Sequence, residues 1–124
     1  MKGTLVGSVR AWVRLARPPF HTVGVLPFIL GAVVAWRLGG MFRWQVAGWG
    51  TLGVVLIMLA TYFAGEYWDA AEDALSARHG RSRFAGGSGV VQERLLPPRA
   101  PLWGSVVVLV LAVGVGLVLQ LGYR

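Results

Sequence analysis

Three long apolar runs, each free of Lys, Arg, Asp and Glu, set the pattern of the chain. They cover residues 20–36, 44–65 and 100–123. A helix needs about 20 consecutive apolar residues to cross a bilayer, so the first run is at the lower limit and the other two are long enough. The pattern predicts an all-α membrane protein with three transmembrane helices.

Residues 1–17 have a different pattern, in which apolar residues recur at helical intervals between basic ones. On a helix, Arg10, Arg14 and Arg17 share one face and apolar side chains occupy much of the other. This arrangement predicts an N-terminal helix that lies at the membrane interface and ends at the two prolines that follow. A signal peptide is the competing interpretation. It is the weaker one, because the next apolar run is long and lacks a small-residue cleavage pattern.

The composition agrees with a membrane protein of one domain, residues 1–124. Hydrophobic residues make up 56% of the sequence and charged residues only 14%, which is too apolar for an ordinary soluble domain. There is no cysteine, which excludes disulfides and thiolate metal sites. The net charge of +7 comes from residues that flank the apolar runs, so nucleic acid is not expected as a partner.

The basic residues also predict the orientation of the chain. With three spans, the N-terminal tail and the loop 66–99 lie on the same side of the membrane, and together they hold nine of the twelve Lys and Arg residues. Short loops rich in Lys and Arg stay in the cytoplasm. We therefore expect a multi-pass protein of the inner (cytoplasmic) membrane, with the N-terminus and this loop cytoplasmic.

The acidic residues gather directly after the second run. Four of the five lie in the segment GEYWDAAED, residues 65–73. On a helix, Glu66, Asp69 and Asp73 fall within a sector of roughly 60°, where their charges repel one another. Oxygen ligands without His or Cys suit Mg²⁺, so these three carboxylates are candidate magnesium ligands. The alternative is a solvated helix end whose acids pair with nearby arginines.

The loop contains a glycine-rich string, RFAGGSGVV, at residues 83–91. Glycines permit conformations in which successive amides point at an oxyanion, and nearby arginines add positive charge. The string is neither a Walker loop nor a Rossmann fingerprint, because the glycine spacing differs. A plain flexible loop is the alternative. The candidate residues for binding a phosphate group are Arg81, Arg83, Gly86, Gly87, Ser88 and Gly89.

Three segments together resemble the amino-terminal part of intramembrane prenyltransferases of the UbiA superfamily. They are LARPPFHTVGVLPFILG (residues 15–31), GEYWDAAED (65–73) and RFAGGSGVVQERLLPPR (83–99). The chain is most similar to the branch that includes 1,4-dihydroxy-2-naphthoate prenyltransferases of menaquinone biosynthesis. The resemblance implies a helical membrane bundle that holds Mg²⁺ and the diphosphate of an isoprenoid donor.

The family's first aspartate-rich motif, N-D-x-x-D-x-x-x-D, falls on residues 65–73. Asp69 and Asp73 match its last two aspartates, while Glu66 stands in place of the first aspartate and Gly65 in place of the asparagine. By the same resemblance, the glycine loop with Arg83 would lie near the diphosphate. Arg17 would mark the Arg-Pro entry to the first span, also near that group.

The resemblance implies Mg²⁺-dependent transfer of a prenyl group to an aromatic or quinone-precursor acceptor. Family members also have a second aspartate-rich motif in another half of the bundle, which these residues lack. Activity is therefore expected to need further sequence, a second chain or self-assembly. The alternatives are a non-catalytic small membrane protein, whether a decayed fragment or an assembly partner, and a binder of nucleic acid or anionic lipid that relies on net charge alone.

Overall fold

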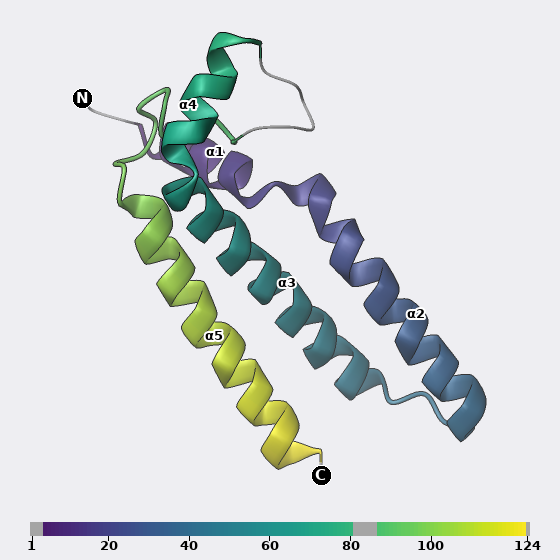
Figure 1. The fold of residues 1–124 in the computed structure, drawn as a ribbon. Coiled ribbons are helices and arrows are strands. Elements are labelled where there is room, and N and C mark those ends of the chain that lie inside the picture. The colour runs from purple at the N-terminus through teal and green to yellow at the C-terminus, as the bar shows by residue number, and fades with distance from the viewer. Residues whose placement is uncertain (1–3, 81–86, 124) are drawn as a thin grey trace. The chain divides into compact units, whose positions relative to one another are not determined.

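The computed structural model describes residues 4–80 and 87–123, and helices are the only regular elements in these ranges. The prediction of an all-α chain is confirmed. Figure 1 shows the elements in chain order. They are α1 (Leu5–Ala16), the 3-10 turn η1 (Pro18–His21), α2 (Thr22–Gly39), α3 (Trp44–Trp68), α4 (Ala70–Arg78) and α5 (Ala100–Gly122).

Three helical stretches of the described chain are long and apolar enough to cross a membrane, as predicted. They are Leu5–Gly39, which includes α1 and η1 as well as α2, then Trp44–Trp68 and Ala100–Gly122. The boundaries differ from those expected, most clearly in α3. This helix continues to Trp68, so Glu66 lies inside it and not in the following loop, because no proline or other helix breaker follows the apolar run there.

The chain forms two compact units, which we describe separately. Unit 1 comprises residues 1–18 and 61–105, and unit 2 comprises residues 19–60 and 106–124. Unit 1 therefore includes α1, the last residues of α3, α4, the glycine loop and the start of α5. Unit 2 includes η1 from Pro19 onward, α2, most of α3 and most of α5.

In unit 1, local hydrogen bonds cap both ends of α1. The hydroxyl of Thr4 accepts a hydrogen bond from the amide of Gly7 at 3.4 Å, which caps the first turn. At the other end Arg17 takes a left-handed conformation with a φ of 48°, and its amide donates to the carbonyl of Arg14. A residue before proline is disfavoured in the helical region, so the helix ends here as the prolines predict.

The two sides of α1 meet different surroundings. Ala11 and Leu15 are buried in unit 1, and the ring of Trp12 packs edge-on against Phe63 of α3, with centroids 5.4 Å apart. Gly104 of α5 permits this contact, because a Cβ there would lie 2.7 Å from the indole. The other side is apolar but exposed, as an interfacial helix requires. Its exposed apolar residues are Leu5, Val6, Val9 and Val13.

In unit 2, α3 lies antiparallel to both α2 and α5. A Cβ on Gly50 would collide with the ring of Phe28, so this glycine brings α2 close to α3. On the other side, a Cβ on Gly53 would meet Val115 of α5 at 3.4 Å. Close approach at small residues is how helices pack in membranes, where apolar side chains gain little from leaving lipid.

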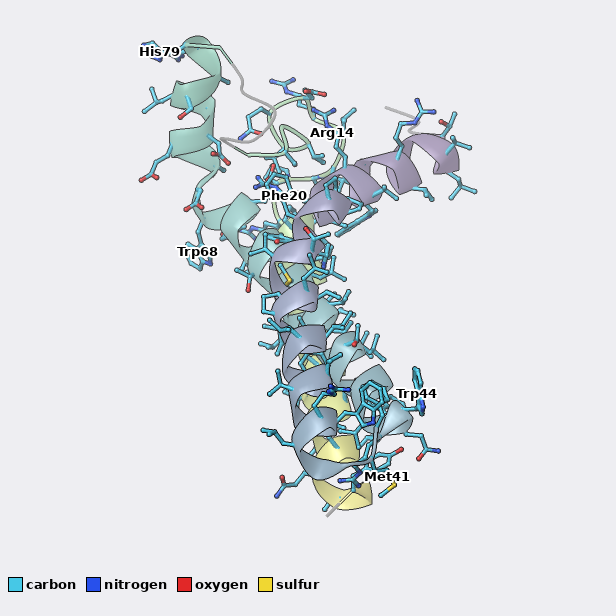
Figure 2. All side chains as sticks on the ribbon, turned by 90° about the vertical axis from the view of Figure 1, so that its right-hand side faces the viewer. Arg14, Phe20, Met41, Trp44, Trp68 and His79 are labelled. Carbon is cyan, nitrogen blue, oxygen red and sulfur yellow. The ribbon has the colours of Figure 1, made fainter. Side chains whose placement is uncertain are left out.

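The α2–α3 loop closes the hairpin with a glycine turn. Gly40 has a φ of 74°, and its amide donates to the carbonyl of Trp36 at 2.8 Å, which ends α2. Met41 lies in this loop, and Trp44 begins α3 directly after it (Figure 2). No residue of α2 is buried, and its exposed side chains are almost all apolar. Such a helix is stable only where its surroundings are also apolar, as in a bilayer.

Candidate functional site

The acidic cluster spans a bend between two helices, with Glu66 in α3 and Asp73 in α4. Asp69 separates α3 from α4 with a φ of −89° and a ψ of 3°. The helical stretch that carries the cluster is therefore interrupted at Asp69. The helical hydrogen bonds nevertheless continue, since the amide of Asp69 donates to Gly65 and that of Asp73 to Asp69, both at 2.8 Å. The spacing between the acids is thus close to the helical one.

Glu66 is buried, with 2% of its surface exposed, and protein donors surround its carboxylate. Its Oε2 accepts a hydrogen bond from the Ser88 amide at 2.9 Å, and its Oε1 accepts one from the Ser88 hydroxyl at 2.7 Å. Nη2 of Arg17 lies 3.6 Å from Oε2. Burying a carboxylate without such partners would cost several kcal/mol, so these contacts explain how α3 tolerates it. We call Arg17, Glu66 and Ser88 the Glu66 cluster.

The described part of the glycine loop has the conformation that its sequence suggests. Gly89 has a φ of 80°, which glycine adopts without strain. The next turn is held by backbone hydrogen bonds from Glu93 to Gly89 at 2.8 Å and from Leu95 to Val90 at 2.9 Å. The fully buried Val90 anchors this turn in unit 1. The predicted residues Arg81, Arg83 and Gly86 lie outside the described residues.

The loop does hold an oxyanion, but in this structure the oxyanion belongs to the chain itself. The amide and hydroxyl of Ser88, predicted to face a phosphate group, both point at Glu66. The structure thus brings together Arg17, Glu66 and Ser88 from three separate segments of the sequence. Both carboxylate oxygens of Glu66 already have protein partners. Its role as a metal ligand stays a prediction.

Asp73 lies against the same loop. A Cβ on Gly87 would collide with the Asp73 carboxylate, so a larger residue there would displace that carboxylate from the loop. Burial, reinforced by the negative charge of Glu66, raises the pKa of the Asp73 carboxyl above its usual range, although a hydrogen bond from the Gly87 backbone and the charge of Arg17 oppose this. Asp69 adds a further repulsion and is itself exposed.

A second ionic contact joins α1 to the loop. The two terminal nitrogens of Arg14 donate to the two carboxylate oxygens of Glu93, at 2.7 and 2.8 Å. Sequence reasoning missed this pair. The available signal was that Glu93 is the one acidic residue outside the cluster and lies in a loop rich in arginine. Periodicity along one helix cannot predict a contact between residues 79 positions apart.

The three predicted metal ligands do not form one site. Among the described residues, no group of three or more His, Cys, Asp or Glu side chains is arranged to hold a metal ion. Glu66 is turned to the loop, while Asp69 lies at the bend and Asp73 in α4. The two aspartates retain the charge that a cation would neutralise, and Mg²⁺ often binds only one or two carboxylates. Comparison of the chain with known proteins finds no matching protein-family model, no matching curated protein and no matching solved structure.

Proposed function

We propose that this chain holds the diphosphate of an isoprenoid donor in a membrane prenyltransferase. The prenyl group would pass to an aromatic or quinone-precursor acceptor, with the rest of the bundle supplied by further sequence, a second chain or self-assembly. One observation carries the proposal. The three segments that resemble UbiA-type enzymes each contribute one residue to the Glu66 cluster, which lies where α3 leaves its apolar run.

Each residue has a distinct part in this proposal. Glu66 is a positioning residue that fixes the glycine loop through Ser88, and Arg17 adds positive charge beside it. Asp69 and Asp73 are the proposed ligands of Mg²⁺, which when bound would neutralise charge on the departing diphosphate. Burial and the charge of Glu66 are the main causes that raise the pKa of Asp73, and Asp69 adds a smaller repulsion. A cation between the two aspartates would relieve that repulsion, which supports this assignment.

The orientation is part of the same proposal. We place unit 1 at the cytoplasmic face of the inner membrane, as the basic N-terminus and loop predict. Magnesium and phosphorylated donors are available on that side. The apolar surfaces of the helices support a membrane location.

Binding of a prenyl diphosphate by the full chain in nanodiscs tests the proposal. We expect geranylgeranyl diphosphate to bind in the presence of Mg²⁺ and binding to weaken on its removal. The double variant Asp69→Asn, Asp73→Asn should weaken binding by at least about tenfold, as loss of metal-site residues does. Glu72→Gln is the control, since Glu72 is an exposed carboxylate on the same helix. Equal binding by the double variant and the control would refute the assigned site.

A second candidate is a non-catalytic membrane protein that uses the Glu66 cluster only to build an assembly. The observation that favours it is that Ser88 and Glu66 already satisfy each other, so the donors expected for a phosphate group are engaged. This candidate predicts no prenyl diphosphate binding with or without Mg²⁺. It also predicts a stable, folded chain under the same conditions.

A further inference from the structure

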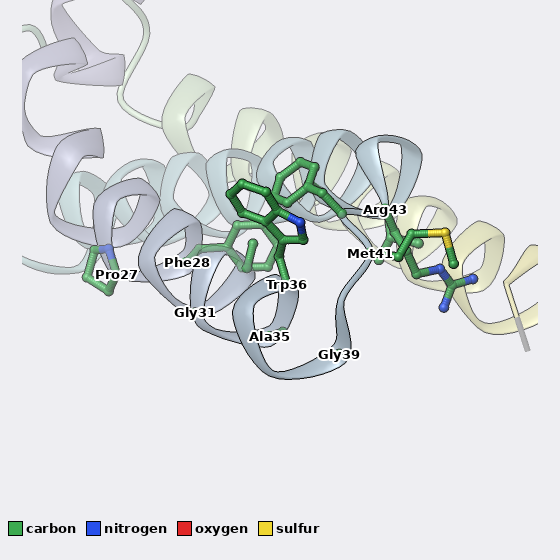
Figure 3. A pocket seen from close by; sticks show the side chains of 12 residues that line it. Pro27, Phe28, Gly31, Ala35, Trp36, Gly39, Met41 and Arg43 are labelled. Atoms are coloured by element: carbon green, nitrogen blue, oxygen red, sulfur yellow. The ribbon is translucent and has the colours of Figure 1, made fainter.

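A pocket lies on the α2–α3 hairpin, wholly within unit 2, and shares no residue with the Glu66 cluster. Its volume is about 550 Å³, within the range of about 300–1,000 Å³ typical of ligand pockets. Eleven of its twelve lining residues are apolar or glycine, and the remaining one is Arg43. Figure 3 shows Arg43 and Met41 near the loop end of the pocket and Pro27 at the opposite end.

Small residues form the floor of the pocket. Gly31, Ala35 and Gly39 follow one another at intervals of one helical turn along α2, and all three line it. A Cβ on Gly31 or Gly39 would meet no other atom within 4 Å, so no described part of this chain packs on these positions. This side of the pocket is therefore narrow and apolar along α2, and it suits a flexible apolar chain.

The loop end of the pocket is positively charged and has no acidic counterpart in unit 2. Residues 19–60 and 106–124 contain three arginines, at positions 37, 43 and 124, and no Asp or Glu. Within the described residues, the side chains of Arg37 and Arg43 make no hydrogen bond or ion pair. Arg37 lies in the last turn of α2 and Arg43 just before α3, so both flank the loop.

Aromatic rings beside the arginines mark the expected depth in the membrane. Phe42 packs edge-on against both Trp36 and Trp44, with ring centroids 5.9 and 4.5 Å apart. Aromatic clusters of this kind, with Trp prominent, sit at the level of lipid headgroups. A ligand with its polar end at the arginines and its apolar end toward Pro27 would therefore have the orientation of a bilayer lipid.

We propose that this pocket binds an anionic phospholipid. One acyl chain lies along Gly31, Ala35 and Gly39, and Arg43, with Arg37, binds the phosphate and the negatively charged headgroup. The charge of the pocket selects this occupant over a helix from a second copy of the chain. The apolar runs of α2, α3 and α5 carry no acidic residue that could meet Arg43.

Native mass spectrometry of the full chain tests the proposal with two lipids of identical acyl chains, phosphatidylglycerol and phosphatidylcholine. We expect phosphatidylglycerol to bind more tightly. Arg43→Gln should reduce that preference by about fivefold, the effect of one basic side chain near an anionic lipid. Arg78→Gln, an arginine on α4 in unit 1, is the control for lost charge and should leave the preference unchanged.

Filling the pocket with a larger side chain distinguishes a bound lipid from other occupants. Gly31→Leu should weaken binding of both lipids, while Gly114→Leu on α5, also in open space, should not. Circular dichroism checks that the variants fold. If Gly31→Leu does not fold, Arg43→Gln alone tests the proposal, because the Arg43 side chain is exposed and its replacement should not disturb folding. Equal binding of the two lipids by the wild type, or an unchanged preference in Arg43→Gln, overturns the proposal. Loss of a dimer in Gly31→Leu with unchanged lipid binding would assign the pocket to a second copy.

Discussion

The two units of this chain share two helices but are stabilised by different physics. Unit 1 contains all five acidic residues and holds its segments together with a buried carboxylate, a bidentate ion pair and a small aromatic core. Unit 2 contains no acidic residue and relies on close helix contacts at glycines such as Gly50 and Gly53. A single helix such as α3 therefore uses polar contacts where it belongs to unit 1 and close contacts at glycines where it belongs to unit 2.

This difference predicts how each unit responds to change. In unit 1, the contacts are specific, so removing a single partner leaves a buried polar group without its hydrogen bond. In unit 2, most apolar side chains are exposed, so many substitutions of similar size should be tolerated if the bilayer is present. The variants below test this contrast in order of decreasing effect.

Glu66→Ala should have the largest effect. It leaves the half-buried amide and hydroxyl of Ser88 without their buried acceptor, and we expect the free energy of unfolding to fall by about 3 kcal/mol. Thermal unfolding in detergent, followed by circular dichroism, measures the change. Glu72→Ala is the exposed control and should change stability by less than about 0.5 kcal/mol. Similar losses in the two variants would contradict the role of Glu66.

Gly104→Ala compares the two halves of α5. Its Cβ would collide with the Trp12 indole, and such overpacking lowers the free energy of unfolding by about 1–3 kcal/mol. This loss should outweigh the stabilisation of about 1 kcal/mol that comes from replacing a glycine in a helix. Gly114→Ala has open space in front of its Cβ and should not destabilise the chain. The same unfolding measurement checks both. A destabilisation that is equal at the two positions would remove the contrast between the units.

The Arg14–Glu93 ion pair should contribute less to the stability of the fold, because both side chains are more than two-fifths exposed. A double-mutant cycle with Arg14→Ala and Glu93→Ala should give a coupling free energy of about 0.5–1 kcal/mol, and high salt should reduce it. A coupling near zero at low salt would mean that the pair does not fasten α1 to the loop.

The smallest effect should be a pH dependence from Asp73, which is partly open to solvent. Its pKa in the folded chain lies above the ordinary value of 3.8, so the folded chain binds this proton more tightly than the unfolded chain does. The contribution of Asp73 to stability therefore falls as the pH rises from about 4 through the raised pKa, and it is constant above that. Asp73→Asn should remove this slope from the unfolding temperature, and Glu72→Gln should retain it. Identical slopes in the wild type and Asp73→Asn would show that the fold does not raise the pKa of Asp73.

The sequence predicted the helical architecture well because hydrophobic periodicity and charge are local properties. Three apolar runs became three long helices, and the prolines after Arg17 marked the end of α1. The boundaries were less accurate, since the apolar run ends at residue 65 while α3 continues to Trp68. A helix ends where its hydrogen bonds end, which composition marks only approximately.

The candidate site was only partly predictable. The sequence singled out Glu66, Asp73 and the glycine loop, and the structure brings these together. It could not predict that Ser88 would turn its donors to Glu66, because the two residues are 22 positions apart and their contact depends on tertiary packing. The magnesium, the diphosphate and the acceptor stay predictions from the resemblance.

Amide hydrogen exchange of residues 87–96 in the full chain, embedded in nanodiscs, tests the role of the Glu66 cluster most directly. The amides of Ser88, Glu93 and Leu95 donate to Glu66, Gly89 and Val90, so they should exchange slowly in the wild type and in Glu72→Ala. They should exchange much faster in Glu66→Ala. Equally fast exchange in the wild type and Glu66→Ala would contradict the account, because Glu66 would then not hold the loop on which the proposed diphosphate site depends.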